Sequence, residues 1–485
     1  MVGERLTDLP GLPARPRLSS QGTMTRSLLR SIARFLVAGS LVSAGQAALA
    51  AAAPAAPASV LYTGATLIDG TGAPARAGQD ILVAGERIVA VGPHGSLGEQ
   101  AAGARAVDLA GRYVIPGLID THVHLATPPN RDRALAILRR QLYGGVTAVR
   151  DMADDLRAVG ELARASLVGE IAGPDIYYAA LMAGTPFFAD PRVLAVSRGF
   201  APGTAPWMQA IDARTDMRTA VTLARGTSAS AIKVYADLTP DLIRAITAEA
   251  HRQHIMIWAH SAVFPTRPAD VIDAGADVVS HVCYLAYQAE PVMLAAYEDR
   301  TPVNEALLAP GGDDPVIARL YDAMRAHGTI LDATGSLFVT FEEKRRNDPQ
   351  AKPLRCTGAA TIRLTQQAMR AGVPISTGTD YETPASDPWP AVHDEIRYLA
   401  HDVGMAPLAV IHAATLVGAQ AAGQGDDMGS IEPGKLANFV VLTADPLADI
   451  DNIERIEMTV KRGRAYARAD YVQPTAVEMG GEDAD

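Results

Sequence analysis

The sequence of 485 residues predicts an α/β fold: a (β/α)8 TIM barrel with a small β-sandwich domain built from both chain ends. Two observations lead to this prediction. Across residues 114–426, short apolar runs alternate with segments of helical period, which is typical of βα units and a parallel sheet. On either side, residues 60–113 and 427–471 carry short strand-like runs separated by glycines. This pattern is typical of small antiparallel sheets.

Eight apolar runs are the candidate barrel strands, and this number fits a (β/α)8 barrel with insertions. The runs are Val114–Val123, Val146–Arg150, Asp175–Ala179, Ala231–Tyr235, Ile255–His260, Asp277–Val282, Ile330–Thr334 and Val373–Thr379. A doubly wound sheet is the alternative, but no G-x-G-x-x-G motif follows an early strand. We expect parts of the long segment from Cys283 to Arg355 to form a lid that carries substrate selectivity.

The first 50 residues have the order of a secretory signal. Three arginines precede an apolar stretch at residues 35–45, and an Ala-Leu-Ala cleavage pattern ends at Ala50. Met24 stands where such a signal should begin; a buried N-terminal helix is the alternative interpretation. We therefore expect a leader over residues 1–50, a flexible lead-in over residues 51–59, and an exported protein, periplasmic or secreted.

Composition excludes several classes of protein. With 43 Lys and Arg against 54 Asp and Glu, the net charge of −11 argues against a nucleic-acid binder, which needs a basic face. Outside the N-terminus no apolar run reaches the roughly 20 residues of a membrane-spanning helix, so no span is expected after processing. The two cysteines allow at most one bridge, and we expect stability from the core and from metal instead. The acidic tail, residues 472–485, is predicted to be disordered.

Unusual polar residues fall inside or at the ends of the predicted strands, where the chemistry of a barrel is expected. His122 and His124 close the first run, and both imidazoles can reach one ion because residues i and i+2 of a strand point to the same side. The other candidates lie in later runs: Lys233, His260, His281 and Asp380. Any one of these histidines alone is more often a core residue. Four histidines, a carboxylate and a lysine in equivalent places predict a metal site.

Lys233, Tyr235 and Asp120 each have two alternative roles. Lys233 is one of only five lysines in the chain, and burial among apolar neighbours is expected to lower its pKa; alternatively it extends to solvent or pairs with Asp237. Tyr235 shares the face of Lys233 and either donates a hydrogen bond to a developing oxyanion or packs in the barrel. Asp120 either orients a ligand histidine or caps the following loop.

Three further pairs of polar residues have either a site role or a structural one. Arg150 and Asp151 are expected to form a buried ion pair near the site. His251 and His254 have the spacing of a helical ligand pair but are interpreted as solvated surface, and His393 and Glu395 are interpreted as structural. The first pair ends the second run, the second lies at the end of the helix before the fifth run, and the third lies on the helix after the eighth run.

The motif His122-Val-His124, followed in order by Lys233, His260, His281 and Asp380, resembles the amidohydrolase superfamily of metal-dependent hydrolases. The resemblance covers residues 60–471, including the turn Ile68-Asp-Gly-Thr-Gly and the closing stretch from Gly429 to Asn438. Within the superfamily the sequence is similar to the imidazolonepropionase-like group, which contains prolidase-like and other exported dipeptidases. One departure is Asn438, where relatives commonly carry Asp; we expect it to affect only the sandwich.

The resemblance implies two divalent metal ions, with zinc favoured and cobalt, manganese or iron as alternatives. His122, His124 and Asp380 would hold one ion, and His260 and His281 the other. Lys233, carboxylated by CO2, and a hydroxide would bridge them. Asp380 would act as the general acid and base, taking the proton of the hydroxide and delivering it to the leaving nitrogen.

The predicted function is hydrolysis of a C–N bond in a small molecule, by a dipeptidase, a prolidase-like enzyme or an N-acyl amino-acid hydrolase. The alternative is the same metal site acting on lactones, carbamates or phosphotriesters, because barrel ends support many chemistries. A non-enzymatic scaffold is disfavoured because all six ligands are present. The sequence leaves a homo-oligomer open.

Overall fold

The computed structural model describes residues 59–480, except 347, 349 and 352. The predicted signal and nearly all of the lead-in lie outside the described residues. The chain divides into two units, Met1–Ala55 and Ala56–Asp485, and every described residue belongs to the second. Within the described residues, no helix combines the length and the apolar character that crossing a membrane requires.

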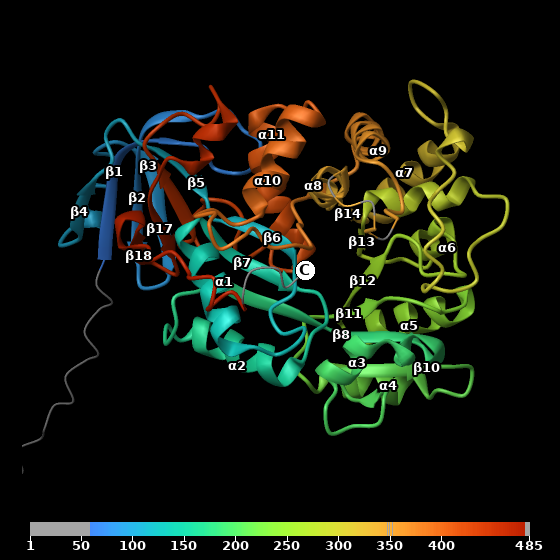
Figure 1. Cartoon of the computed structure of the whole chain (residues 1–485). Coiled ribbons are helices and arrows are strands. Elements are labelled where there is room, and N and C mark those ends of the chain that lie inside the picture. The colour runs from blue at the N-terminus through green and yellow to red at the C-terminus, as the bar shows by residue number, and fades with distance from the viewer. Residues whose placement is uncertain (1–58, 347, 349, 352, 481–485) are drawn as a thin grey trace, which may run out of the picture. The chain divides into compact units, whose positions relative to one another are not determined.

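Eight parallel strands form a nearly closed barrel (Figure 1). They are β6 (Leu118–Val123), β7 (Val146–Asp151), β8 (Asp175–Gly184), β11 (Ala231–Val234), β12 (Met256–His260), β13 (Val278–Ser280), β14 (Ile330–Asp332) and β15 (Ile375–Ser376). Two backbone hydrogen bonds join the last strand region to the first: Thr121 N donates to Thr377 O at 2.9 Å, and Asp380 N donates to His122 O at 2.8 Å. The predicted barrel is confirmed, and each predicted run overlaps one of its strands, although β8 extends to Gly184, beyond the predicted end at Ala179.

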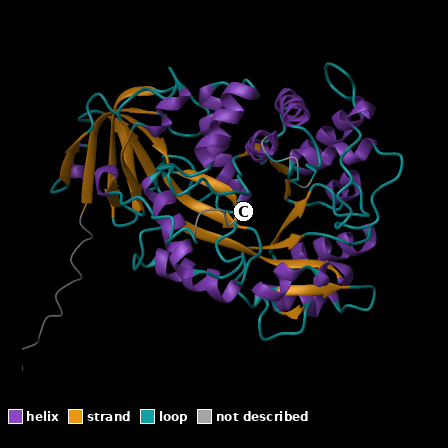
Figure 2. Cartoon of the chain, in the orientation of Figure 1, coloured by secondary structure: helices purple, strands orange, loops and turns teal. Residues whose placement is uncertain are grey.

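Helices cover the outside of the barrel and follow its strands in turn (Figure 2). The longer ones are α1 (Arg131–Tyr143), α2 (Leu156–Leu167), α4 (Met217–Arg225), α5 (Pro240–Arg252), α7 (Pro315–His327), α8 (Gly335–Arg346) and α9 (Gly358–Ala371). The shorter ones are α6 (Pro268–Asp273), α10 (Val392–Arg397), α11 (Pro407–His412) and α12 (Gly418–Ala421). Several begin where a polar side chain caps the first turn; Asn130, Asp216 and Thr357 each accept a hydrogen bond from the backbone three residues on. These caps fix where a helix starts and therefore where the preceding loop ends.

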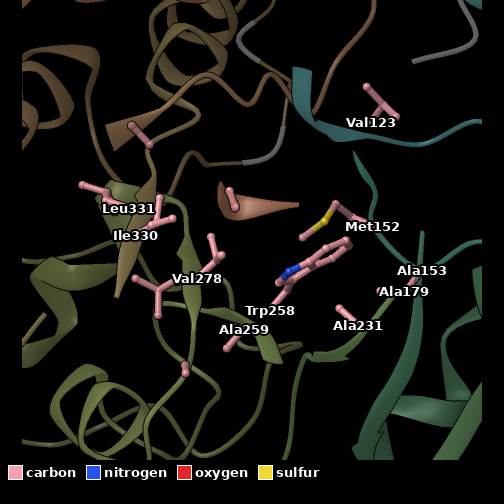
Figure 3. Close-up of a cluster of buried hydrophobic side chains, with 14 of the residues drawn as sticks. Val123, Met152, Ala153, Ala179, Ala231, Trp258, Ala259, Val278, Ile330 and Leu331 are labelled. Atoms are coloured by element: carbon pink, nitrogen blue, oxygen red, sulfur yellow. The ribbon is translucent and has the colours of Figure 1, made fainter. Parts of the chain in front are cut away.

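The barrel interior is apolar below the site. Small residues such as Ala179 and Ala231 leave room for the fully buried indole of Trp258 (Figure 3). The guanidinium of Arg150 lies over that indole, 4.4 Å from the ring centroid. This layer closes the barrel beneath the polar groups at the strand ends.

An insertion follows β8 before α4 begins. It consists of η2 (Thr185–Ala189), α3 (Pro191–Val196), β9 (Thr204–Ala205) and β10 (Met208–Ile211). β10 pairs in parallel with the last part of β8, with Met208 opposite Leu181, beyond the β8 residues that pair with β7. The insertion therefore widens the sheet beside the last part of β8.

Strands from both ends of the described chain form a second, mostly antiparallel sheet, which we call the terminal sheet. Its order is β18-β17-β16-β5-β1-β2-β3, with β4 also pairing β1. The strands are β1 (Ser59–Leu67), β2 (Arg76–Ala84), β3 (Arg87–Pro93), β4 (Arg105–Asp108), β5 (Tyr113–Pro116), β16 (Phe439–Leu442), β17 (Ile456–Lys461) and β18 (Arg464–Ala467). The N- and C-terminal parts meet where β5 pairs with β16. In the core, the rings of Tyr62 and Phe439 meet edge to face with centroids 5.0 Å apart.

The first predicted strand, residues 114–123, is corrected to two strands. Tyr113–Pro116 belongs to the terminal sheet and Leu118–Val123 to the barrel. The chain passes from one sheet to the other at Gly117, where an added Cβ would lie 2.1 Å from the Thr147 hydroxyl oxygen. The apolar run is continuous in sequence because both strands are buried.

The predicted disorder of the acidic tail is wrong for residues 472–480. Arg139 on α1 donates to the carbonyl of Val472 at 3.0 Å and pairs with Glu478 at 3.1 Å. Met479 is buried against the barrel core. One cation and one apolar side chain anchor this stretch, and overall composition does not reveal them.

The expectation that the fold does without a disulfide is also wrong. Cys283 and Cys356 are bonded across 73 residues of sequence. The bridge connects η3 (Val282–Ala289), directly after β13, to the residues before α9. Sequence spacing alone does not reveal that this long segment returns to its starting point.

Candidate active site

A cavity of about 410 Å³ opens at the carboxyl ends of the barrel strands. All seven residues predicted for the site line it: His122, His124, Lys233, Tyr235, His260, His281 and Asp380. They come from five different strands or strand ends, which is how a barrel assembles a site from distant parts of the sequence.

Asp380 lies among three imidazoles. Its Oδ1 is 3.6 Å from His122 Nε2 and 3.4 Å from His124 Nε2, and its Oδ2 is 3.9 Å from His281 Nε2. The ligand atoms of His122, His281 and Asp380 all lie within 4.8 Å of one another. Asp380 is thus close both to His122 and His124, which the resemblance assigns to one ion, and to His281, which it assigns to the other.

Each of these imidazoles is held from its other side. His122 Nδ1 lies 2.8 Å from Asp332 Oδ2, and His124 Nδ1 lies 2.7 Å from Asp154 Oδ1. His281 Nδ1 lies 2.9 Å from the hydroxyl of Thr334. Such partners fix the ring orientation and leave the Nε2 atoms facing the cavity.

Asp332 and Asp154 anchor candidate ligands but were not predicted from the sequence, and Asp332 makes the more extensive contacts. It is fully buried at the end of β14 and also accepts hydrogen bonds from Thr121 and Ser280. Arg150 Nη2 lies 3.2 Å from its carboxylate, so the partner of Arg150 is Asp332 and the predicted pair with Asp151 is wrong. Burial raises the pKa of Asp332, but the hydrogen bond from His122 and the charge of Arg150 lower it to about 2. A signal was available, since Asp332 lies in a predicted strand like the other candidates.

Close backbone packing lets this network form. At Gly378 an added Cβ would lie 1.9 Å from Asp332 Oδ1 and 2.8 Å from His122 Cβ. Asp120 accepts from the backbone NH of His122 and from the hydroxyl of Thr379. It therefore links the two sides of the barrel seam through a backbone NH on one side and a side-chain hydroxyl on the other, and it makes no hydrogen bond to a ligand imidazole.

Lys233 is fully buried on β11, and its Nζ has no hydrogen-bond partner among the described residues. Both alternative interpretations fail: the side chain does not reach solvent, and Asp237 accepts from the backbone NH of Tyr297. Burial lowers the pKa of Lys233 to about 7, although Asp332 and Asp380 act in the opposite direction. A substantial fraction of this amine is neutral near neutral pH.

The other ionisable groups divide by their surroundings. Burial lowers the pKa of His281 to about 3, and that of His260 falls well below its usual value through burial and the nearby Lys233. Burial alone would raise the pKa of Asp380, but the surrounding histidines hold it far below its usual range. Asp154 keeps the pKa of His124 well above the usual value despite burial. Neutral imidazoles beside a carboxylate are a typical donor set for zinc and related cations.

Tyr235 faces the cavity from just beyond β11. Its ring lies 4.1 Å from that of His260, and its hydroxyl lies 3.0 Å from the hydroxyl of Tyr297. Burial raises the pKa of Tyr235 well above its usual value, so the hydroxyl stays protonated and can act as a donor.

The segment from Cys283 to Arg355 contributes a wall of the cavity through Tyr284, Tyr297 and Phe341. Arg355 donates to the carbonyl of Tyr297, and Cys356 is bonded to Cys283 next to Tyr284. The segment also contains α7 and β14, which belong to the barrel itself.

The remaining polar candidates lie outside the cavity lining. His251 is partly exposed and lies 3.0 Å from Asp277, and His393 Nε2 lies 2.7 Å from the carbonyl of Gly144. Glu395 is buried and accepts from the backbone NH groups of Gly335 and Ser336.

The chain belongs to the amidohydrolase family, whose pattern it matches over residues 113–466. Imidazolonepropionase of Pseudomonas savastanoi pv. phaseolicola is 24% identical over 411 residues, covering 76% of this chain and 88% of that protein. The chain also matches N-acyl-D-aspartate deacylase of Alcaligenes xylosoxydans xylosoxydans at 46% identity, over 69 residues that cover 14% of this chain and 13% of that protein.

Two solved structures have the same fold. A Xaa-Pro dipeptidase with bound methionine aligns at a TM-score of 0.65, with 22% identity, over 84% of this chain and 100% of the other. The ochratoxinase of A. niger aligns at a TM-score of 0.66, with 21% identity, over 86% of this chain and 99% of the other. The protein is thus a hydrolase of a family that acts on C–N bonds in small molecules and is generally metal-dependent.

Proposed function

We propose that the protein is a metal-dependent hydrolase that cleaves the amide bond of dipeptides or N-acyl amino acids. One observation carries the proposal: Asp380 lies among three Nε2 atoms whose imidazoles are each anchored through Nδ1. Anchored nitrogen donors around a carboxylate suit a divalent cation and leave no need for a cysteine ligand.

The residues that would hold metal are His122, His124, His260, His281 and Asp380, with Lys233 between them. They fit this role because burial favours the neutral imidazoles of His122, His260 and His281, and because Lys233 Nζ and His260 Nδ1 are buried with no partner among the described residues. Divalent cations bound there supply Lewis acidity toward a carbonyl oxygen and toward water.

Lys233 contributes as a carbamate in this proposal. Its neutral amine adds CO2: an N–C bond forms, one N–H proton leaves to solvent, and the product is an anion with two oxygen donors. Burial without a partner and the lowered pKa both support this role, because a protonated ammonium would have no compensating hydrogen bond.

Asp380 accepts the proton of the attacking water and delivers it to the leaving nitrogen. The protonated hydroxyl of Tyr235 stands on the same cavity wall and donates to the carbonyl oxygen as negative charge develops there. The Tyr284 and Tyr297 wall limits the access of bulk water to the reacting amide.

We also propose that the enzyme works outside the cytoplasm. The order of residues 1–50 supports export, and the Cys283–Cys356 bridge is of a kind that persists in oxidising compartments. Recovery of the protein from a periplasmic or secreted fraction, with its N-terminus near residue 51, tests this part; retention of residues 24–50 in the cytoplasm would refute it.

The decisive experiment is turnover by the full chain, loaded with zinc, cobalt or manganese, against dipeptides, N-acyl amino acids, lactones and phosphotriesters. Amide cleavage that stops when a chelator removes the metal supports the proposal. Turnover of lactones or phosphotriesters with no amide cleavage would overturn it.

Lys233→Ala separates the carbamate from a purely structural lysine. We expect loss of turnover that returns in part with added short carboxylic acids, which can occupy the emptied space as a bridging anion. Lys435 lies outside the cavity, so Lys435→Ala is the matched control. This variant should keep wild-type turnover, and added carboxylic acids should not change it. Full activity of Lys233→Ala in unsupplemented buffer would contradict the role of Lys233.

A further inference from the structure

A second, smaller chamber adjoins the main cavity. Its volume is about 50 Å³, and it shares five lining residues with the main cavity: His124, Thr127, Met152, Arg192 and Tyr235. The shared residues include a metal-ligand candidate, His124, and the proposed oxyanion donor, Tyr235. A group of a substrate bound at Asp380 can enter it without leaving the site.

The chamber is apolar and belongs largely to the insertion after β8. Phe187, Val193, Val196 and Met208 come from that insertion, each at most 5% exposed, and Leu181 comes from β8 itself. This part of the chamber favours a small aliphatic group, and the polar side chains of the lining are among those that it shares with the main cavity.

Arg192 stands at the shared entrance. Its Nε and Nη2 bind the carboxylate of Asp190, which holds the guanidinium in place, while Nη1 makes no hydrogen bond to any described residue. The side chain is about half exposed. It is close enough to the hydroxyls of Tyr235 and Tyr297 to interact with both electrostatically. A fixed guanidinium with a free N–H suits a carboxylate on the bound substrate.

Taken together, a guanidinium beside an aliphatic chamber matches one chemical unit: an α-amino acid with a free carboxylate and a small aliphatic side chain. We propose that this chamber and Arg192 select substrates whose leaving group is such an amino acid, with the side chain in the chamber and the carboxylate on Arg192. The inference rests on the proposed amide hydrolysis and assigns selectivity to the insertion after β8 in addition to the wall from residues 283–355.

Chamber size is tested with Val196→Ile and Val196→Ala. The readout is kcat/KM across N-acetyl amino acids with glycine, alanine, valine, leucine, proline and phenylalanine. Wild type should prefer the small aliphatic residues over glycine and phenylalanine. Val196→Ile should lower the leucine-to-glycine ratio roughly tenfold, and Val196→Ala should move the optimum toward larger side chains. Val159, a buried valine of α2 that lines neither cavity, provides the control variants Val159→Ile and Val159→Ala, which should leave the ratio unchanged.

The carboxylate contact is tested with Arg192→Gln. KM should rise roughly tenfold for N-acyl amino acids and not for their C-terminal carboxamides, because only the former carry the anion. Arg133 lines the main cavity but not the chamber, so Arg133→Gln is the matched control. A carboxylate-specific effect at Arg133, or an equal effect of Arg192→Gln on acids and carboxamides, would overturn the assignment.

Calorimetric binding of free L-leucine and L-leucinamide gives a readout independent of turnover. Wild type should bind leucine more tightly than leucinamide, and both Val196→Ile and Arg192→Gln should weaken leucine binding. If no amide is cleaved but leucine binds in this way, the proposed reaction fails while the chamber assignment stands. If amides are cleaved with a preference that the Val196 variants leave unchanged, despite melting temperatures like that of wild type, the inference is wrong.

Discussion

The carboxyl end of the barrel and the hydrophobic core of the terminal sheet differ in the side chains that they bury. The barrel end buries His122, Lys233 and the ion pair of Arg150 with Asp332, whereas the core of the terminal sheet is built from side chains such as Leu67 and Phe439. Buried ions cost desolvation free energy that their mutual attraction only partly offsets, while buried apolar area stabilises directly. The difference separates the part of the molecule arranged for chemistry from a part that mainly contributes stability.

The largest expected effect lies at Asp380. Asp380→Asn should lower kcat roughly 10³-fold, because the amide cannot take up and return the proton. The melting temperature of the metal-free protein should fall, because the surrounding histidines hold the pKa of Asp380 far below its usual range and its charge therefore stabilises the fold near neutral pH. Stopped hydrolysis with an unchanged far-ultraviolet circular dichroism spectrum would fit this assignment; kcat within a few-fold of wild type would contradict it.

Asp332→Asn should affect both stability and activity. The substitution leaves the Arg150 guanidinium buried without its anion and weakens the anchor of His122, at a cost of about 3–5 kcal/mol in the free energy of unfolding. Urea unfolding of the metal-free protein measures the stability change, and metal content after dialysis measures the loosened ligand. Unaltered stability and metal retention would show that Asp332 is not the centre of this network.

Leu67→Ala should destabilise the terminal sheet without altering the chemistry. Loss of this fully buried side chain should lower the free energy of unfolding by about 2–4 kcal/mol. At temperatures where the variant is folded, kcat and KM should match those of wild type. A change in kcat would show that the two regions are coupled more closely than their separate cores indicate.

The smallest expected effect concerns His94, an exposed residue of the terminal sheet region that lies 2.9 Å from Asp80. The hydrogen bond and charge of Asp80 raise the pKa of His94 above 6.5, so its stabilising contribution is complete below pH 6.5 and is lost as pH rises through the folded-state pKa. His94→Gln should therefore flatten the pH dependence of stability above pH 6.5. Thermal unfolding at pH 6 and pH 8.5 measures the difference, and an identical pH dependence in both proteins would contradict it.

Most of the barrel was predictable because its strands are buried on both sides and read as short apolar runs. The site residues were predictable for a related reason, since a charged or imidazole side chain at the end of such a run is costly unless it has a function. The boundary at Gly117 was not predictable, because both flanking strands are apolar. The contact of Cys283 with Cys356 was not predictable either, because it depends on how 73 residues fold back.

Asp332 is also a charged side chain at the end of an apolar run, but its role was not predicted. It occupies a strand end like Asp380, but it has no metal-ligand spacing with a neighbour and emerges only when Arg150 and His122 are placed beside it. The role of the insertion after β8, residues 185–211, was not predictable, since a short apolar helix and two short strands have no distinctive sequence pattern.

Because the insertion after β8 is separate from the metal-ligand candidates, substrate preference can change without changing them. Gly378 leaves no room for any other side chain between Asp332 and His122, so the seam of the barrel tolerates little change. The insertion after β8 supplies no metal-ligand candidate, and it can exchange aliphatic side chains while the ligands keep their anchors. A library that varies Val193, Val196 and Met208 should therefore yield many active clones with altered preferences, whereas one that varies the seam should yield mostly inactive ones.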